Sequence, residues 1–531
     1  MEFKAAYKDP IEKIRVEEYP QMQDGTYLDH GGSTQHAKSL MEQFARDLTS
    51  NLYGNPHSGS APSVLSGERM DRIREGTLRF FKADPEHFDL VFVANATAAV
   101  KLVSDLFRDH ADRSRASAPW KRSGFRYFYH MDVHTSIAGV REVANAGHHC
   151  FSSDQEVEEW LSGSHDHSSQ NKRAAQLFAY CAQSNMTGRR LPLRWTGDVR
   201  KSSHTSGTFT LLDAAAFATT GCLDLSDPSI APDFTCLSFY KIFGFPHLGA
   251  LIIRKSPQVT SLIRNRRYFG GGTVEVVTAL EDSPLHSKKR TDYHSALEDG
   301  TPAYLSILAL GHAIKIFNQL FTSMTCVSQH TASLTKRLWD GMVGLRHTNG
   351  RPMIQIYNHN SAIYGDAKTQ GATIAFNILG PDGSPVAPFE VEKTADKNRI
   401  YLRSGRLCNP GGVAQHLGWS AAEIRGMYNS GMRCDLPAGV YRGKPLGSVR
   451  VSLGAMSTPG DVDIFLDFLR EEYRDKDPVK YDEAELFAGA VVESSEDEST
   501  VAGTSRAASE KAQYSAARPR SRRLLLWFCR G

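Results

Sequence analysis

One stretch, from Asp233 to Lys255, constrains the fold and chemistry of this chain more than any other. It reads DFTCLSFYKIFGFPHLGALIIRK, so two apolar runs typical of buried strands flank Lys241 and a turn rich in Gly and Pro. A single lysine among aromatic residues indicates an amine held in a confined site. Burial lowers the pKa of a lysine, and an uncharged amine can form a Schiff base with an aldehyde. The alternative interpretation is a lysine that begins a surface loop.

A second stretch, FTLLDAAAF from Phe209 to Phe217, predicts a buried strand that ends in Asp213. Carboxylates at the carboxyl ends of parallel strands face the ligand crevice of an open α/β sheet. An Asp followed along the chain by a Schiff-base lysine suits pyridoxal phosphate (PLP), because the Asp keeps the pyridine nitrogen protonated and the ring able to accept electrons. The alternative for Asp213 is a helix cap at the strand end.

Other polar residues also follow predicted strands. Ala96 and Thr97 open a helix directly after an apolar run and predict a phosphate seat. His134 follows the next strand, where its ring could lie on a planar group, and Asn185 follows a further strand, where it could donate to a cofactor oxygen. A helix cap, a structural histidine and a turn asparagine are the plainer alternatives. Strands that alternate with helices predict an α/β fold with a large, doubly wound, mostly parallel sheet, whose edge would collect these side chains.

The C-terminal half adds a cysteine and two arginines. Cys408 lies in a loop rich in Gly and Pro, near Arg403 and Arg406, a setting that favours a thiolate. A buried structural cysteine is the alternative. Arg450 lies within a predicted strand whose residues alternate between apolar and polar. It either faces solvent or binds a carboxylate with its guanidinium.

Composition excludes several classes of protein. The net charge of +3 is too small to indicate a protein that binds nucleic acid, and no apolar run is long enough for a membrane helix. The start of the chain shows no secretory signal. The eight cysteines are scattered without a CxxC pair, which argues for a reducing compartment and against a metal site. We therefore expect a cytoplasmic protein that contacts neither membrane nor nucleic acid.

The chain is predicted to divide into an enzyme unit and a tail. Strand-like alternation from about Met353 to Ile400 indicates a second, smaller α/β domain. The expected divisions are a large subdomain at about 50–330, a small subdomain at about 1–49 and 331–478, and a disordered low-complexity tail at 479–531. A Gly run at 268–273 could wrap a phosphate, cross to a partner subunit or act as a plain linker.

Nine segments together carry a family resemblance. They are YLDHGGST, NLYGNPHS, VHTSIAGVRE, LLDAAAF, SFYKIFGFP, YFGGGT, LEDGTP, LRSGRLCNPGG and GSVRVSLGAMST. On the basis of these segments, roughly residues 20–475 resemble one branch of the fold-type I PLP enzymes. This branch is that of the class V aminotransferases, or NifS-like cysteine desulfurases. The chain is most similar to the N-terminal desulfurase part of the molybdenum cofactor sulfurase family.

This resemblance implies a role for each candidate residue. Lys241 would hold PLP, Asp213 would pair with its ring nitrogen, His134 would stack on the ring and Asn185 would contact the ring hydroxyl oxygen. The phosphate would be held by Ala96, Thr97 and Ser238 and, from the partner subunit of a homodimer, by Thr273. The carboxylate of the substrate, L-cysteine, would bind Arg450 and Arg403. Catalysis would rest on Lys241, His134 and Cys408, which would accept the sulfur as a persulfide.

The resemblance therefore predicts a desulfurase-type sulfurtransferase that converts L-cysteine to alanine. The molybdenum cofactor or a carrier protein would accept the sulfur. The chain departs from the family pattern at Ser404, at Arg406-Leu407 and in the Gly-Gly-Val after Pro410, and we expect no C-terminal domain that binds the molybdenum cofactor. The alternatives are a PLP-dependent lyase or aminotransferase for another amino acid, and an inactive truncated paralogue that serves as a binding partner.

Overall fold

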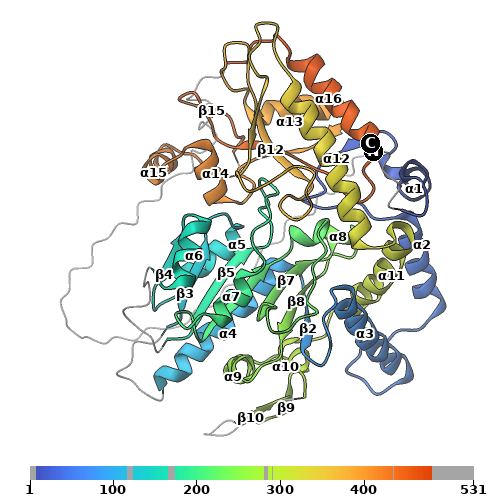
Figure 1. Ribbon diagram of the computed structural model, residues 1–531. Helices are drawn as coiled ribbons and strands as arrows, with labels where there is room; N and C mark the ends of the chain where they lie inside the picture. Colours follow the sequence, from blue (N-terminus) through green and yellow to red (C-terminus); the bar gives the residue numbers. More distant parts are fainter. Residues whose placement is uncertain are drawn as a thin grey trace, which may run out of the picture. The chain divides into compact units, whose positions relative to one another are not determined.

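A computed structural model describes residues 7–116, 124–164, 174–279, 285–289, 291–434 and 436–480 (Figure 1). The predicted tail, apart from its first two residues, lies outside these ranges. Within them, the chain forms one large sheet and one smaller sheet, each covered by helices.

The large sheet positions the candidate residues. Its strands lie in the order β2 (Phe88–Val93), β8 (Gly249–Arg254), β7 (Phe234–Ser238), β6 (Thr208–Asp213), β5 (Gln176–Cys181), β3 (Arg126–His130) and β4 (His148–Phe151). β8 runs antiparallel to both of its neighbours, and the other pairings are parallel. The prediction of a mostly parallel α/β sheet is confirmed.

The helices of the N-terminal two-thirds pack against this sheet or against one another, and α4 (Ala96–Ala116) contacts both β7 and β8. Their bounds are α1 (Ile11–Glu18), α2 (Lys38–Ser50), α3 (Ala61–Phe80), α4 (Ala96–Ala116), α5 (Thr135–Ala138), α6 (Asp154–Ser162), α7 (Trp195–Lys201), α8 (Tyr240–Phe243), α9 (Pro257–Asn265), α10 (Tyr293–Leu297) and α11 (Tyr304–Phe321). Short 3-10 turns cover Pro20–Met22, Gly139–Val143 and Phe217–Thr219.

The smaller sheet is antiparallel, in the order β11 (Ile354–Tyr357), β12 (Thr373–Ile378), β17 (Ser448–Ser452) and β14 (Arg403–Gly405). The remaining helices are α12 (Met324–Gly344), α13 (Pro388–Lys397), α14 (Pro410–Leu417), α15 (Ala421–Asn429) and α16 (Pro459–Tyr473). Three short pairs complete the fold: β1 (Thr26–Tyr27) with β13 (Ile400–Tyr401), β9 (Val274–Val277) with β10 (His286–Lys288), and β15 (Val440–Tyr441) with β16 (Lys444–Pro445). A smaller α/β part is thus present, while the domain boundaries given above stay a prediction.

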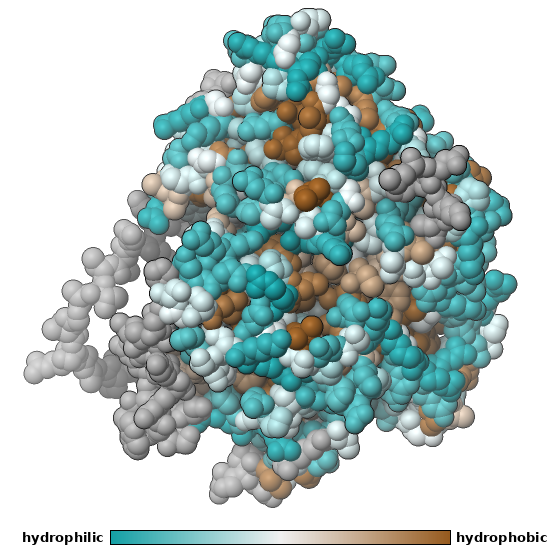
Figure 2. All heavy atoms as spheres, viewed as in Figure 1, coloured by the Kyte–Doolittle hydropathy of each residue, from teal (hydrophilic) through white to brown (hydrophobic). Residues whose placement is uncertain are grey.

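Three hydrophobic cores stabilise the described part of the chain, and the third includes Leu417 of α14 and Met427 of α15. The largest core lies about the parallel sheet and includes Phe128, Phe178 and Trp195, and the second joins α12 and α16 to the smaller sheet. Hydrophilic side chains cover most of the face shown in Figure 2, and apolar side chains gather in smaller patches between them. No single helix of the described residues is both long and apolar enough to span a membrane, although α11 and α12, bent by 59°, reach that length and composition together.

The Glu298 carboxylate, in the LEDGTP segment, is buried and bonded to the large sheet. It pairs with Arg74 at 2.6 Å and accepts the backbone N–H of Phe92 at 2.7 Å, and both charged side chains are more than nine-tenths buried. Removing one partner of a buried pair leaves an uncompensated charge. Glu298→Ala is therefore expected to lower the free energy of unfolding by about 3–5 kcal/mol in urea titrations. Glu68→Ala, which breaks the exposed pair with Arg72, should cost at most about 1 kcal/mol; equal effects would contradict this role.

Candidate active site

Seven of the predicted cofactor residues line one cavity of about 180 Å³ at the carboxyl ends of the parallel strands. They are Ala96, Thr97, His134, Asn185, Asp213, Ser238 and Lys241. Each lies on or just after a strand or at the start of the helix that follows it, because parallel strands deliver their carboxyl ends to one edge. The sequence argument that these residues converge is borne out by the geometry, while their individual roles stay predictions.

Lys241 lies in α8, the single turn that follows β7. Burial lowers the pKa of its amine, and the positive charges of Arg450 and Arg403 lower it further, whereas Asp213 opposes the shift. The turn ends at Gly244, whose φ of +78° and close approach to the backbone of Gln35 leave no room for a side chain. The amine is thus held in a confined site, in a state that favours its neutral, nucleophilic form.

Asp213 ends β6, and 7% of its surface is exposed. One carboxylate oxygen, Oδ1, accepts the backbone N–H of Ala215 at 3.0 Å and so closes a local turn. The alternative of a helix cap is wrong, because the 3-10 turn that follows begins after Ala216 and has no side-chain cap. The negative charge of Asp213 raises the pKa values of both Lys241 and His134 against the lowering effect of burial. The carboxylate therefore favours a cation in the cavity, as a protonated ring nitrogen would require.

His134 has a structural function as well as a place in the cavity. Its Nδ1 accepts the backbone N–H of Ser136 at 3.2 Å and so caps α5. Burial lowers the pKa of the imidazole. The bond to Ser136 holds the ring in one orientation, and burial favours its neutral form, which suits a flat contact with an aromatic ring.

The start of α4 forms the opposite end of the cavity. The backbone N–H of Ala96 donates to Ser238 Oγ at 3.0 Å, and that of Ala98 donates to Asn95 Oδ1 at 3.0 Å. A Cβ on Gly249 would lie 2.5 Å from the Cα of Asn95, so β8 approaches this turn at a distance that only glycine allows. A helix N-terminus with hydroxyl groups beside it suits a phosphate. An amine, a carboxylate, an imidazole and an anion seat in one cavity together fit PLP.

Cys408 lies beside this cavity on the segment that joins β14 to α14. Its side chain is exposed, so the alternative of a buried structural cysteine is wrong. The backbone N–H of Thr135 donates to the Cys408 carbonyl at 2.9 Å, and Asn185 Nδ2 donates to the Leu407 carbonyl at 2.6 Å. The cysteine segment is therefore bonded to Asn185, which lines the candidate PLP site, and to Thr135, which lies between two residues that line it.

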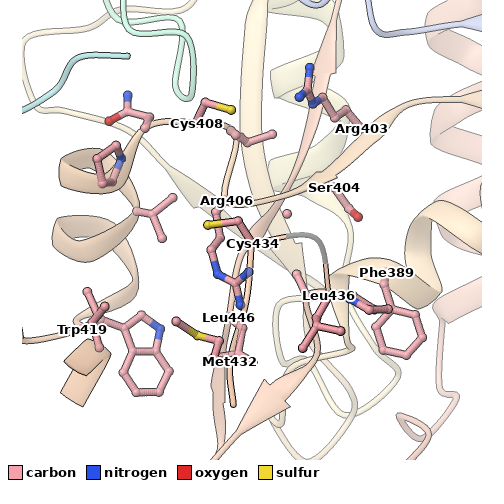
Figure 3. A pocket seen from close by; sticks show the side chains of 18 of the residues that line it. Phe389, Arg403, Ser404, Arg406, Cys408, Trp419, Met432, Cys434, Leu436 and Leu446 are labelled. Atoms are coloured by element: carbon pink, nitrogen blue, oxygen red, sulfur yellow. The ribbon is translucent and has the colours of Figure 1, made fainter. Parts of the chain in front are cut away.

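A second cavity, of about 590 Å³, opens on the other side of Cys408 (Figure 3). Its lining is mostly apolar and includes Trp419. Its charged groups are Glu392, Arg403 and Arg406, and Cys434 is a second exposed thiol. Arg406 donates to the Arg433 carbonyl at 2.8 Å. No sequence pattern pointed to Cys434, because it meets Cys408 only in the folded chain, where both line this cavity.

Arg450 is the clearest candidate for a carboxylate partner. It is 3% exposed, so the alternative of a solvent-facing arginine is wrong. Its Nη1 donates to the Asn185 carbonyl at 2.9 Å, and its Nη2 pairs with Asp29 Oδ1 at 2.5 Å. Arg403 lies opposite Arg450 across the β14–β17 pairing. Asp29, from the YLDHGGST segment, is a functional neighbour that the sequence argument missed, since it is distant in the chain.

Thr273 stands apart from these residues in the subunit described. It is fully buried in its own Gly-rich turn, where its hydroxyl donates to the Gly270 carbonyl at 2.9 Å. Asp299 pairs with Arg266 beside this turn and accepts the Gly270 N–H at 2.8 Å. The contact from Thr273 to the phosphate of a partner subunit stays a prediction.

Comparison with known proteins agrees with this geometry. The family model described as Aminotransferase class-V matches residues 26–465. A molybdenum cofactor sulfurase of Aspergillus niger is 51% identical over 475 residues, which are 90% of this chain and 56% of the relative. A second, from Aspergillus terreus, is 50% identical over 90% of this chain and 55% of its own length. The chain thus spans about half the length of these curated relatives.

Among solved structures, the apo structure of a cysteine desulfurase from Thermococcus onnurineus superposes with a TM-score of 0.64 at 20% identity, over 87% of this chain and 97% of that one. This likeness concerns the fold. The family model covers most of the chain, including every candidate site residue. The chain belongs to the aminotransferase class-V family.

Proposed function

We propose that this chain is a PLP-dependent cysteine desulfurase-type sulfurtransferase. It would convert L-cysteine to alanine and leave the sulfur on Cys408 as a persulfide. The observation that carries the proposal is an exposed thiol, Cys408, on a segment bonded to Asn185, which lines the cavity that contains Lys241. The same segment is bonded to Thr135, which lies between His134 and Ser136 of that lining. The names of the relatives, molybdenum cofactor sulfurase and cysteine desulfurase, support the same reaction class.

Each residue has a chemical task in this proposal. PLP, when bound, would withdraw electrons from the substrate carbons next to the amino group. Lys241 would hold it and move protons at the substrate, and Asp213 would keep its ring nitrogen protonated. His134 would lie on its ring, Asn185 would contact its ring oxygen, and the start of α4 with Ser238 would hold its phosphate. The Cys408 thiolate would attack the substrate sulfur and form an S–S bond as the C–S bond breaks. The carbon that loses the sulfur would take up a proton, so one cysteine yields one alanine and one persulfide.

The sulfur acceptor, the assembly and the location belong to the same proposal. The relatives' name supports the molybdenum cofactor, or a carrier protein that serves molybdenum cofactor biosynthesis, as acceptor. The apolar cavity beyond Cys408 provides a place for an acceptor to approach the persulfide. We further propose a cytoplasmic homodimer in which Thr273 of one subunit completes the phosphate site of the other.

The test is the product of L-cysteine turnover by the full, PLP-loaded chain under reductant. Alanine should form in a 1:1 ratio with sulfide. Pyruvate and ammonia in place of alanine would identify a lyase, and a keto acid formed from another amino acid would identify an aminotransferase. Either result would overturn the proposal.

Arg450→Lys should weaken substrate binding more than it slows chemistry. A lysine has no planar guanidinium and cannot keep both the Asn185 and the Asp29 contacts while it binds a carboxylate. Loss of a charge-assisted hydrogen bond predicts a KM for L-cysteine that is roughly 10–100-fold higher, with a smaller change in kcat. Steady-state kinetics measure this, with Arg337→Lys at an exposed ion pair as control. An unchanged KM would exclude Arg450 as the carboxylate partner.

A further inference from the structure

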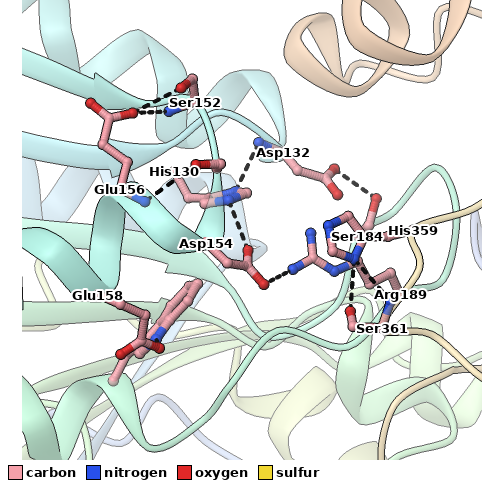
Figure 4. Close-up of polar contacts among 12 residues, drawn as sticks. His130, Asp132, Ser152, Asp154, Glu156, Glu158, Ser184, Arg189, His359 and Ser361 are labelled. Atoms are coloured by element: carbon pink, nitrogen blue, oxygen red, sulfur yellow. Dashed lines mark hydrogen bonds and ion pairs between the residues drawn. The ribbon is translucent and has the colours of Figure 1, made fainter.

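A buried carboxylate, Asp132, lies between the candidate PLP site and the cysteine segment. It follows β3 and is 4% exposed. Its Oδ1 accepts from Ser184 Oγ at 2.7 Å and from Asn409 Nδ2 at 2.6 Å. None of the ion pairs found among the described residues includes Asp132, whereas its neighbour Asp154 pairs with Arg189 (Figure 4). Neutral donors therefore satisfy this carboxylate, and one of them, Asn409, is the residue after Cys408.

Asn409 uses every polar atom of its side chain. It is fully buried, and its Nδ2 donates to Asp132 Oδ1 and, at 3.1 Å, to Asn185 Oδ1. Its Oδ1 accepts the backbone N–H of Gly412 at 2.9 Å and so caps α14. One side chain thus joins the end of β3, the segment after β5 and the start of α14.

Asn185 completes the connection on the other side of Cys408. Its Nδ2 donates to the Leu407 carbonyl, and its Oδ1 accepts from Asn409. Residues on both sides of the cysteine are therefore bonded to a residue that lines the candidate PLP site.

The backbone at the cysteine needs such support. Leu407 and Cys408 have φ values of +54° and +52°, in the left-handed region that residues other than glycine rarely adopt. Two consecutive residues in this region persist only where the surroundings hold them. The bonds from Asp132, Asn185 and Thr135 supply that restraint.

From these contacts we infer that Asp132 is a positioning residue, which holds Cys408 against the candidate PLP site through Asn409. The inference rests on the proposed function for its catalytic consequence, and on the bonds above for its structural one. Asp132 acts on the position of the thiol and touches neither substrate nor PLP. We expect Asp132 to determine the fraction of time for which the Cys408 thiol lies close enough to the substrate to accept its sulfur.

The test uses Asn409→Asp and its charge-swapped partner. In Asn409→Asp, two carboxylates face each other where an amide faced a carboxylate. Their repulsion should displace the cysteine segment from the candidate PLP site. In Asp132→Asn/Asn409→Asp the amide and the carboxylate have exchanged places, and aspartate still caps α14. The swap restores the bond between positions 132 and 409 but not the one from residue 409 to Asn185 Oδ1, because a carboxylate cannot donate. Asn349→Asp, at an exposed asparagine that donates to the Pro381 carbonyl, makes the same chemical change elsewhere.

Two readouts are needed. Peptide-resolved mass spectrometry gives the rate at which iodoacetamide alkylates Cys408, with and without PLP, and the alanine assay gives turnover. Asn409→Asp should raise the Cys408 alkylation rate and lower kcat by roughly 10–100-fold, the effect of losing a hydrogen bond to a charged group. The absorbance of bound PLP and the KM for L-cysteine should stay near the wild-type values. The swapped double variant should recover at least about 10-fold of the lost kcat, and Asn349→Asp should match the wild type.

The outcomes separate the two claims. Wild-type alkylation of Cys408 in Asn409→Asp would overturn the inference, as would a double variant no better than the single one. If the wild-type chain forms no alanine, the proposed function fails, and the alkylation rates still decide the positioning role. If Asn409→Asp does not fold, Asn409→Ser takes its place, because serine keeps the cap of α14 and loses the bond to Asp132; it should show the same faster alkylation.

Discussion

Lys241→Ala is expected to remove covalent PLP attachment and to lower alanine formation from L-cysteine by at least about 10³-fold. The lysine is the one amine that lines the candidate PLP site, among the residues that the structure describes there. Burial lowers its pKa, so the variant loses both the nucleophile and the group that moves protons at the substrate. After borohydride reduction, the wild-type peptide that contains Lys241 should carry the mass of PLP.

The matched control is Lys255→Ala. Lys255 follows β8 and is exposed, and its amine donates to the Pro85 carbonyl at 2.7 Å, so its loss should leave PLP attachment and turnover near the wild-type values. PLP found on another lysine, or alanine formed by Lys241→Ala at the wild-type rate, would contradict the assignment of the site.

Cys408→Ser should abolish transfer of sulfur while PLP remains bound. A serine hydroxyl has nearly the shape of the thiol, but it is a much weaker nucleophile near neutral pH and cannot form a persulfide. Sulfide release under reductant should fall by at least about 10³-fold, since the step has no other nucleophile in this proposal. The absorbance of bound PLP should be unchanged, because Cys408 contacts the walls of the site through its backbone.

Cys434→Ser is the control for this variant, as it removes the other exposed thiol of the same cavity. It should retain alanine formation. If Cys408→Ser still released alanine and sulfide at the wild-type rate, Cys408 would not be the sulfur carrier. If Cys408→Ser released pyruvate, the result would reveal a lyase reaction at the PLP site. In the wild type, attack by the Cys408 thiol would outcompete that reaction.

The sequence predicted the large sheet because its signal is local. Apolar runs of strand length mark β2, β3, β5, β6 and β7, and polar residues at their ends fall at one edge of any parallel sheet. The direction of β8 was beyond such reasoning, because an apolar run has the same pattern in both directions. Pairing with β2 and β7 decides it.

The residues that hold Cys408 in place could not be predicted, because their contacts join segments far apart in the chain. Asn409 reaches Asp132 across 277 positions, and Arg450 reaches Asp29 across 421. The sequence offered Arg450 both a solvent-facing and a buried interpretation, and only the packing of β17 against β14 and β12 selects the buried one. The role predicted for Thr273 cannot be read from one subunit, because it depends on contact with a second subunit.

The measurement that tests the central claim most directly follows the sulfur of L-cysteine. The full, PLP-loaded chain is mixed with L-cysteine that carries heavy sulfur, in a single turnover without reductant, and alkylated peptides are weighed. The account predicts one heavy sulfur atom on the peptide that contains Cys408, formed in step with one alanine per chain. Alanine formed with the heavy sulfur on another cysteine, or with none on any cysteine, would contradict it.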